Sequence, residues 1–525
     1  MRGNVYLCGP PGAGKSTLAP LLAALRGLES VDVDAAVEAA DGRPIARIVE
    51  EDGEPAFRDA ERSAIAAVAA RGGSVVALGG GALADARNRD ALAVSGLLVF
   101  LDASLATCEE RTANAPGTRP LLAAPGALAT LHAARRPLYE NAALRVVVDG
   151  LTPEAAARAV DAALREERIV HVATAKPYDV AIGPHVLEEL GTRAAPLPGG
   201  RAVVVVDERV DALGRRVARA YESAGIAARI VGVRADESLK SLAAIGALYA
   251  EFIAAGPDRR GVVVGVGGGT IGDAVGFAAA TYQRGVPFVA IPTTLLSAVD
   301  AAIGGKTALN LEAGKNLVGT VTQPAHVAIA PHALRSLPPR DVVSGYGEML
   351  KYGLALDPAL YRALRAGESA LLADPATALE AIARCVELKA EIVARDEEDR
   401  TGTRAILNFG HTVGHAVEKV AGYGELRHGE AVIVGMRAAL ALSVARGLLD
   451  EAARAEADAH LQTLPVPNSW RGLDADALIE ATRGDKKRHA GGTQFVLLDA
   501  IGSARLDDGV RHEDVRAALH AIGLR

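Results

Sequence analysis

The sequence has few of the residues that bind nucleic acid or cross-link secreted proteins. Aromatic residues make up 3% of its 525 residues and the net charge is −7, whereas nucleic-acid sites usually combine a basic surface with stacking rings. The three cysteines, Cys8, Cys108 and Cys385, are far apart and form no CxxC pair. A reduced, cytoplasmic protein that acts on small molecules and binds no nucleic acid is therefore expected.

Long hydrophobic runs are also missing. The longest uncharged apolar stretch, residues 286–299, contains Pro287 and Pro292 and is too short to cross a bilayer. The first residues run directly into an apolar strand pattern, which leaves no room for a signal peptide. These features predict a protein with no membrane partner.

Lysine is scarce, since only ten of the 57 basic residues are lysines. A compact ammonium cannot be replaced by arginine where one point charge must meet one oxygen. The lysines of interest are Lys15, in a glycine-rich loop, and seven more, most of them in the second half of the chain: Lys240, Lys306, Lys315, Lys351, Lys389, Lys486 and Lys487. We interpret this distribution as a site for a polyanionic ligand.

Two glycine-rich loops of different design each follow an apolar run. Residues 9–17 follow the run 5–8, and residues 265–273 follow the run 262–264. Only glycine lets several backbone N–H groups point inward at a phosphate without a Cβ clash. Two such loops indicate two enzymes on one chain.

The strand and helix patterns divide the chain into three predicted domains. Alternating strands and helices predict a P-loop-type α/β domain over residues 1–167 and a second α/β domain over residues 168–335. From residue 336 to 525, long amphipathic patterns predict a mostly helical domain. The strands expected in the first domain are Val5–Cys8, Ser74–Leu78, Leu97–Leu101 and Arg145–Val148.

The first loop has the full Walker A pattern in a strand–loop–helix context. Gly12 and Gly14 shape the loop, Lys15 reaches phosphate oxygens, and Ser16, followed by Thr17, faces Mg²⁺. The pattern predicts ATP with Mg²⁺ as the ligand.

Two acids follow the loop in sequence. In an extended segment the carboxylates of Asp32 and Asp34 would share one side, so that Asp32 could hold magnesium while Asp34 takes a proton. A Walker B-like strand that ends at Asp102 is the weaker alternative, because it lies farther from the loop in sequence.

Residues 1 to about 165 resemble shikimate kinase. The resemblance rests on five motifs in order: residues 32–34, Phe57-Arg58-x-x-Glu61, residues 79–81, residues 119–122 and residues 135–139. It implies ATP-dependent phosphorylation of shikimate. Another small-molecule P-loop kinase, such as a gluconate kinase, is the alternative.

The resemblance also implies residue roles. Asp34 would deprotonate the acceptor hydroxyl, Arg58 and Arg135 would hold the shikimate carboxylate, and the turn with Gly80 and Gly81 would lie beside it. Two arginine forks on one carboxylate fix its orientation. Arg119 would reach the transferred phosphoryl from a mobile lid, and Arg111 would lie over the adenine.

The second loop fits a dinucleotide fingerprint only in part. Gly267, Gly269 and Gly272 have the right spacing, but the acid expected about 20 residues later for the ribose is missing. Asp207, at the end of another strand pattern, is a substitute.

Four residues later in the chain are candidate metal ligands. His411 and His415 are spaced to share one helical face, and His428 and Glu348 complete the set. The spacing predicts a metal site.

The region from residue 168 to the C-terminus resembles 3-dehydroquinate synthase. The resemblance rests on residues 281–285, 292–296, 304–307, 314–316, 344–351, 410–415, 426–430 and 485–487. It implies bound NAD⁺, a divalent metal (Zn²⁺ or Co²⁺) and conversion of 3-deoxy-D-arabino-heptulosonate 7-phosphate to 3-dehydroquinate. The implied steps are alcohol oxidation, phosphate elimination, ketone reduction and ring closure by an aldol step.

This second resemblance also implies roles for named residues. The implied metal ligands are Glu348, His411 and His428. The implied catalytic residues are Lys351, Lys389, Arg404, Asn408 and His415. Further substrate contacts are Asp300, Lys306, Lys315, Asn316 and Lys486, with Arg284 reaching a neighbouring subunit's site in a homodimer. The implied cofactor contacts are Asp207, Glu237, Lys240, Gly268, Gly269, Asp273, Thr293 and Thr294.

Alternatives for this region are another sugar-phosphate cyclase, a metal-dependent polyol dehydrogenase or a nucleotide-sensing scaffold. The lysine cluster argues against the dehydrogenase, and the complete catalytic sets argue against the scaffold. In the implied pathway the two reactions are the second and fifth steps, so neither passes its product to the other. The two halves are therefore expected to work independently.

Overall fold

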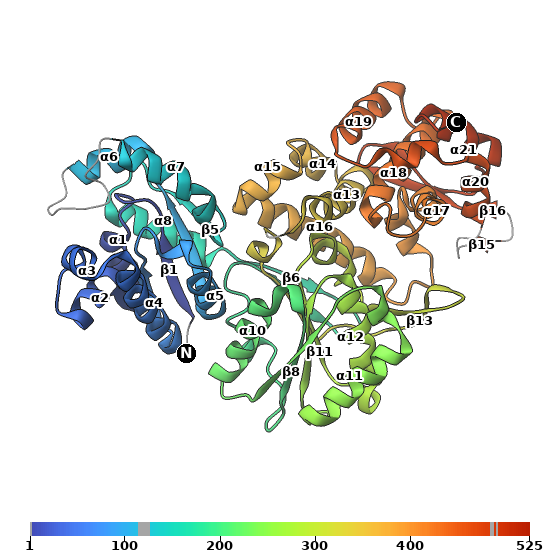
Figure 1. Cartoon of the computed structure of the whole chain (residues 1–525). Coiled ribbons are helices and arrows are strands. Elements are labelled where there is room, and N and C mark those ends of the chain that lie inside the picture. Colours follow the sequence, from blue (N-terminus) through green and yellow to red (C-terminus); the bar gives the residue numbers. More distant parts are fainter. Residues whose placement is uncertain (1–2, 114–125, 336, 484–487, 490–491, 525) are drawn as a thin grey trace.

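The computed structural model describes residues 3–113, 126–335, 337–483, 488–489 and 492–524 (Figure 1). Residues 3–165, which we term the N-terminal lobe, contain a parallel five-stranded sheet in the order β2-β3-β1-β4-β5. Its strands are β1 (Asn4–Cys8), β2 (Glu29–Asp32), β3 (Ser74–Ala77), β4 (Gly96–Asp102) and β5 (Leu144–Val147). Its helices are α1 (Lys15–Arg26), α2 (Val33–Asp41), α3 (Ile45–Asp52), α4 (Glu54–Arg71), α5 (Ala86–Ser95), α6 (Leu105–Ala113), α7 (Ala127–Glu140) and α8 (Pro153–Arg165).

Alternation of side chains along the strands gives this sheet two apolar faces. Val5 and Leu7 of β1 belong to one buried cluster, which includes Leu22 of α1 and Val160 of α8. Tyr6 lies in the cluster on the other face, together with residues of α4 and α7. Helices therefore cover both faces, as a parallel sheet requires.

Residues 168–524, termed the C-terminal body, begin with a seven-stranded sheet in the order β6-β7-β14-β11-β10-β8-β9, parallel except between β6 and β7. Its strands are β6 (Arg168–Val172), β7 (Tyr178–Ile182), β8 (Ala202–Asp207), β9 (Ala228–Val233), β10 (Val262–Gly267), β11 (Phe288–Pro292) and β14 (His326–Ile329). Helices α9 (Leu190–Arg193), α10 (Asp211–Ser223), α11 (Leu242–Ala255) and α12 (Gly269–Thr281) and the hairpin β12 (Lys306–Leu311)–β13 (Gly314–Val321) accompany it.

The rest of the body is mostly helical. Its helices are α13 (Pro339–Ala355), α14 (Pro358–Leu364), α15 (Glu368–Ala373), α16 (Pro375–Arg395), α17 (His411–Ala421), α18 (His428–Ala445), α19 (Glu451–Thr463), α20 (Ala475–Arg483) and α21 (His512–Ala521). Two short hairpins, β15 (Arg488–His489) with β16 (Gly492–Thr493) and β17 (Phe495–Ala500) with β18 (Ser503–Asp507), interrupt them.

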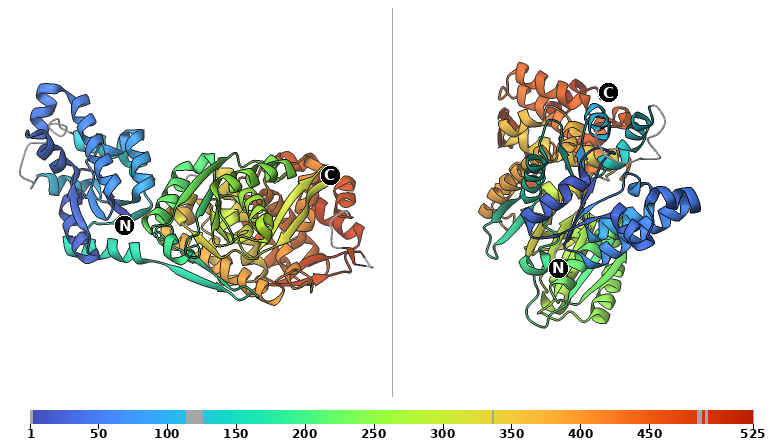
Figure 2. Two further views of the ribbon diagram at one scale, coloured as in Figure 1. Left: turned by 90° about the horizontal axis from the view of Figure 1, so that it is seen from below. Right: turned by 90° about the vertical axis from the view of Figure 1, so that its left-hand side faces the viewer.

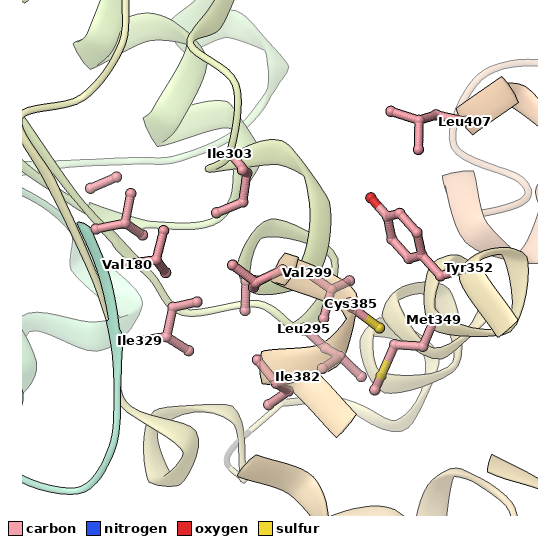
Figure 3. Close-up of a cluster of buried hydrophobic side chains, with 14 of the residues drawn as sticks. Val180, Leu295, Val299, Ile303, Ile329, Met349, Tyr352, Ile382, Cys385 and Leu407 are labelled. Carbon is pink, nitrogen blue, oxygen red and sulfur yellow. The ribbon is translucent and has the colours of Figure 1, made fainter. Parts of the chain in front are cut away.

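One buried apolar cluster joins the body's sheet to its helices. Figure 3 shows Met349 of α13 and Cys385 of α16 on one side, Ile329 of β14 on the other, and Leu295 and Val299 between them. This packing holds the segment 295–303 between sheet and helices. The segment carries one of the site residues described below.

The lobe lies to one side of the body and contacts it (Figure 2). Helix α5 packs against α10 (Figure 1), and Arg219 of α10 donates to the carbonyls of Ala69 and Ala70, at the end of α4. Arg335 donates to the carbonyl of Ala142, just after α7. The two halves therefore share a polar interface, which no sequence pattern predicted.

The expected fold class is confirmed, with two local differences. Strand β2 was not expected, because it is short and half of it is exposed. Asp32 and Asp34 do not share an extended segment: Asp32 ends β2 and caps α2 by accepting from the Ala35 N–H at 3.2 Å, and Asp34 lies in the first helical turn. A carboxylate one to three residues before a helix favours the cap over a longer strand.

Helix α18 has the length and apolar composition of a membrane span among the described residues, but 83% of its apolar window is buried inside the body. It is packed against α13, α17, α19 and α21. Its composition is that of a helix in the centre of a core.

Two candidate active sites

The first glycine loop connects β1 to α1. Gly12 and Gly14 have φ of 85° and 94°, and a Cβ on Gly12 would lie 2.7 Å from the Cys108 carbonyl oxygen. Both positions therefore require glycine. The Lys15 ammonium lies over the loop and donates to the carbonyls of Gly9 at 2.8 Å and Pro10 at 3.1 Å.

A cavity of about 690 Å³ opens in front of this loop. It is lined by every described residue that the sequence assigned to the kinase site: Gly12, Gly14, Lys15, Ser16, Thr17, Asp32, Asp34, Arg58, Gly80, Gly81, Arg111 and Arg135. Arg119 lies outside the described residues. These segments, which are far apart in sequence, meet at one end of the sheet. There the cavity is surrounded by α1, α2, α4, α6 and α7.

The turn at residues 79–81 lies directly against the charged side chains of the cavity. A Cβ on Gly79 would be 2.5 Å from Glu61 Oε1 and 2.9 Å from Asp34 Oδ1. A Cβ on Gly81 would be 2.7 Å from two guanidinium nitrogens of Arg58. Three glycines in a row therefore allow the backbone to approach these charges closely.

Asp34 has the electrostatics of a general base. It faces the open cavity, but the surrounding protein removes part of its water, and the carboxylates of Asp32 and Glu61 add repulsion. Together these effects raise the pKa of Asp34 to about 6, although Lys15 opposes them. A carboxylate with a pKa just below neutrality is charged at pH 7 and still accepts a proton readily.

Glu61, the last residue of the Phe57-Arg58-x-x-Glu61 motif, lies in the site, although the sequence predicted no role for it. Its side chain is 1% exposed and pairs with Arg58 at 2.9 Å, one helical turn away on α4. Glu54 contacts the same guanidinium at 2.9 Å. The i,i+3 spacing after Arg58 was the available signal, and the pairing orients Arg58 toward the cavity.

The Walker B-like strand does not supply a cavity residue. Asp102 ends β4 as expected, but its carboxylate pairs with Arg136 of α7 at 3.0 Å and with Arg145 of β5 at 2.5 Å. Two guanidinium groups leave no free oxygen for a magnesium ion. Asp102 instead ties β4 to α7 and β5.

The second candidate site lies where α13, α17 and α18 meet. Nε2 of His411 and Nε2 of His428 are 3.6 Å and 3.4 Å from Oε1 of Glu348. The ligand nitrogens of His411, His415 and His428 lie within 4.8 Å of one another. The Glu348 carboxylate is fully buried: its Oε1 faces the two histidine nitrogens and its Oε2 pairs with Lys351 at 2.6 Å. A carboxylate grouped with imidazoles in this way is a donor set that suits a divalent cation.

The protonation states differ between the two histidines. Burial lowers the pKa of His411 to about 3, so this ring is neutral, as a metal ligand must be. Burial also disfavours the charge on His428, but hydrogen bonds to Glu348 and Glu418 raise its pKa to about 10. Its Nδ1 faces Glu418 and its Nε2 faces Glu348, and a divalent cation would take the place of the Nε2 proton.

Glu418 is a second functional candidate that the sequence reasoning missed. It accepts from Nδ1 of His428 at 2.9 Å, and hydrogen bonds of this kind orient histidine ligands. Glu418 follows His411 and His415 at spacing i, i+4, i+7, so it lies on the same face of α17. That spacing was the signal for it.

Glycines let the three helices approach closely enough for this cluster. A Cβ on Gly429 of α18 would lie 1.8 Å from the Ser344 carbonyl oxygen of α13. A Cβ on Gly435 would lie 1.9 Å from the carbonyl oxygen of Gly410, which precedes α17. Backbone therefore packs directly on backbone at both contacts.

A buried ionic cluster adjoins the histidines. Lys351, one turn after Glu348 on α13, contacts Glu348 at 2.6 Å and Asp300 at 3.3 Å. Asp300 lies in a π-helical turn, Ser297–Ala301, and its carbonyl accepts from Lys389 of α16 at 2.6 Å. The Lys351 and Lys389 ammonium groups hold the pKa of Asp300 well below its usual range.

Several predicted cofactor contacts gather around the second glycine loop, between β10 and α12. Lys240 donates to Asp273 at 2.7 Å and to Asn316 at 2.5 Å. A Cβ on Gly268 would be 3.0 Å from Thr294 Cγ2, and Gly269 is the first residue of α12.

Three other predicted contacts flank this loop. The Thr293 N–H donates to the Gly267 carbonyl at 3.0 Å. Glu237 accepts from Asn310 at 2.6 Å. Asp207, at the end of β8, pairs with Arg209 at 2.6 Å.

The remaining predicted residues are distributed around these clusters. Arg404 is buried and donates to the Glu397 carbonyl at 3.0 Å, and Asn408 ends the same short helix. Lys306 pairs with Asp399 at 2.6 Å.

Two further predicted residues lie toward the surface, and one is not described. Lys315 lies over the Tyr423 ring at 4.1 Å. Arg284 is exposed with φ of 66°. Lys486 lies outside the described residues.

Comparisons with known proteins agree with both geometries. Residues 230–344 match the family model of the 3-dehydroquinate synthase N-terminal domain, and residues 345–488 match that of the C-terminal domain. The 3-dehydroquinate synthase of Rhodopirellula baltica is 41% identical over 321 residues, which cover 61% of this chain and 86% of that protein. The chain belongs to the 3-dehydroquinate synthase family.

The lobe matches a second family, because residues 11–165 fit the shikimate kinase family model. The shikimate kinase of Acinetobacter baumannii is 34% identical and covers 30% of this chain and 91% of that chain, with a TM-score of 0.30. The synthase and shikimate kinase family models together show a bifunctional shikimate-pathway enzyme, with a kinase domain and a phosphate-eliminating cyclase.

A solved cyclase structure resembles the body. The 2-epi-5-epi-valiolone synthase of Streptomyces hygroscopicus, with NAD⁺ and Zn²⁺ bound, is 31% identical, covers 66% of this chain and 96% of that chain, and has a TM-score of 0.60.

The glycine contacts of α18 generate a prediction for the synthase domain. Gly429→Ala should force α18 away from α13, destabilise the protein by about 1–3 kcal/mol through overpacking and lower its metal content. Thermal unfolding and elemental analysis measure both effects. Gly246→Ala is the control, because Gly246 of α11 has open space around it. Equal metal content in both variants would contradict this account of the cluster.

Proposed function

We propose that the lobe cavity binds ATP·Mg²⁺ on the loop of residues 9–17 and shikimate between Asp34 and the two arginines, Arg58 and Arg135. The observation that carries this proposal is the convergence of loop, base and arginines on one cavity of about 690 Å³. Lys15 and Ser16 would hold the phosphates and the metal ion, with Asp32 as a further oxygen ligand.

Asp34 would orient the acceptor hydroxyl and take its proton. Its raised pKa, about 6, keeps it charged at neutral pH while making it a stronger base than an ordinary aspartate. Arg58 and Arg135 would clamp the substrate carboxylate. Glu61 and Glu54 would hold Arg58 in position through their ion pairs with its guanidinium, so that the clamp is preorganised.

Asp34→Asn should lower the rate of shikimate phosphorylation by about 10²–10⁴, the usual cost of losing a general base. ATP binding should remain nearly intact, because Lys15 and the loop are unchanged. A coupled assay of ADP release and ATP titration by calorimetry measure the two quantities. Asp41→Asn, at the exposed far end of the same helix, is the control. Turnover at the wild-type rate would refute the role of Asp34.

For the body, we propose that Glu348, His411 and His428 hold a divalent metal, zinc or cobalt. The buried Glu348 carboxylate and the two facing Nε2 atoms support this donor set. Such a metal, when bound, polarises a substrate oxygen and lowers the pKa of an alcohol. Glu418 would orient His428, and His415 would serve as a hydrogen-bonding or acid/base group beside the donors.

The buried lysines suit a phosphorylated, acidic substrate. Lys351 and Lys389 present two ammonium groups from adjacent helices around Asp300. Burial lowers the pKa of Lys389 to about 8, so this group can release a proton near neutral pH. Arg404, Asn408, Lys306, Lys315 and Lys486 would complete the substrate contacts.

We propose that NAD⁺ binds at the loop between β10 and α12. Gly268, Gly269, Thr293 and Thr294 would approach the pyrophosphate, and Asp207 would meet a ribose hydroxyl. A hydrogen-bonded set of residues lies beside the loop. Lys240 binds Asp273 and Asn316, and Asn310 links Asn316 to Glu237. The solved structure of the valiolone synthase, which contains NAD⁺ and Zn²⁺, supports both cofactors. NAD⁺ supplies reversible hydride acceptance.

Chelation by EDTA should eliminate the cyclase activity, and added Zn²⁺ or Co²⁺ should restore it. His428→Ala should retain little metal, because each ligand of a three-residue donor set is required. Elemental analysis measures this without reference to activity. His171→Ala, at an exposed histidine paired with Asp179, is the control. A full metal complement in the His428 variant would show that the donor set is different.

We further propose a cytoplasmic homodimer formed through the body, in which Arg284 serves the neighbouring subunit. Its exposed, left-handed backbone position supports an outward role. Mixing the Arg284→Ala and Lys351→Ala chains should recover synthase activity that neither has alone, since mixed dimers contain one complete site. If sedimentation confirms that mixed dimers form but no activity is recovered, Arg284 acts in its own subunit's site.

A further inference from the structure

A side chain of the C-terminal body binds backbone carbonyls at the end of α7 in the N-terminal lobe. Arg335 follows a 3₁₀ turn of the body, Pro331–Leu334. Its Nη1 donates to the carbonyl of Ala142 and, at 3.4 Å, to that of Glu140. Glu140 is the last residue of α7, and Ala142 precedes β5. The contact thus spans the junction between helix and strand.

The backbone carbonyls at the end of α7 need hydrogen-bond donors from outside the helix. The last carbonyls of a helix lack intrahelical partners, and a cation there is favourable. Asn141 Nδ2 donates to Pro137 O at 3.1 Å, and the Ala142 N–H donates to Tyr139 O at 2.9 Å. Among the described residues, Arg335 has no carboxylate within ion-pair distance, so its charge is directed at the carbonyls.

The same helix end supports the kinase cavity. The Tyr139 hydroxyl donates to the Gly80 carbonyl at 2.6 Å, and its buried ring stacks on Phe100 with centroids 5.5 Å apart. Arg135 lies about one turn earlier on α7, and its Nη1 would be 3.4 Å from a Cβ placed on Gly80. A shift of this helix end would therefore move both the glycine turn and a cavity arginine.

A second body residue binds the end of α4, another helix that lines the cavity. Arg219 donates to Ala69 O at 2.5 Å and to Ala70 O at 2.9 Å. These carbonyls are at the C-terminal end of α4, which carries Arg58 and Glu61. The two helices that carry Arg58 and Arg135, the arginines proposed to hold the substrate carboxylate, thus have carbonyls at or just after their ends bound by arginines of the body.

We propose that Arg335 is a positioning residue for the kinase site, through which the synthase domain sets the affinity for the kinase's acidic substrate. The proposal rests on the proposed function of the lobe cavity. It departs from the expectation that the two halves work independently: the reactions remain chemically separate, but the kinase site depends on a side chain of the synthase.

Arg335→Met in the full-length chain tests this proposal, because methionine keeps the apolar length and removes the donors. The KM for shikimate should rise roughly tenfold, the cost of one charge-assisted hydrogen bond, with kcat little changed. Synthase kcat/KM should stay at its wild-type value. Amide hydrogen exchange should accelerate in peptides over residues 136–145 and stay unchanged over residues 45–53.

Two further variants separate positioning from general stability. Arg335→Lys retains a donor and should recover part of the lost affinity. Arg229→Met removes an exposed arginine of β9 that pairs with Glu251 and should change neither activity.

An unchanged KM with unchanged exchange would overturn the proposal, and so would a parallel loss of both activities. If the wild-type chain failed to phosphorylate shikimate, the proposed function would fall, while the exchange measurement would still decide whether Arg335 holds α7.

Discussion

The synthase site depends on one buried lysine that is shared by two carboxylates. Lys351 is 1% exposed and lies between Glu348 and Asp300. Removing a single charge from water costs several kcal/mol, so each of these groups is stable inside only if the others are present. The array ties α13 to the π-helical turn at residues 297–301, and Lys389 adds α16 to it. The charges that suit an acidic, phosphorylated substrate therefore also fix the elements that surround it.

Small residues decide how closely these elements can approach. Gly429 and Gly435 let α18 pack its backbone on α13 and on the start of α17, and Gly79 and Gly81 do the same for the charges of the kinase cavity. In both sites, glycine has a packing role in addition to its role in the phosphate loops. Close backbone approach brings side chains from three elements within the reach of one ion or one carboxylate.

The sequence predicted what depends on local pattern. The Walker A loop, the helix that starts at His411 and the i,i+4 spacing of His411 and His415 follow from strand and helix periodicity. The extended segment expected for Asp32 and Asp34 is wrong, because Asp32 caps a helix that begins at Val33. Asp102, the weaker magnesium candidate, is neutralised by Arg136 and Arg145, which are far from it in sequence. Glu418 needed the position of His428 to acquire a role. The helical spacing places Glu418 on the same face as His411 and His415, but the sequence alone does not specify the long-range pairing with His428.

The abundance of arginine has a physical consequence for the joined halves. A terminal guanidinium nitrogen carries two N–H groups, so one nitrogen can bind two neighbouring carbonyl oxygens. Arg219 binds two consecutive carbonyls of the lobe, and Arg335 binds two that are two residues apart. The guanidinium is also more weakly hydrated than an ammonium, which suits a contact at the junction between two domains. Lysines are thus concentrated where single phosphate or carboxylate oxygens are expected, and arginines join the two halves through exposed backbone at helix ends.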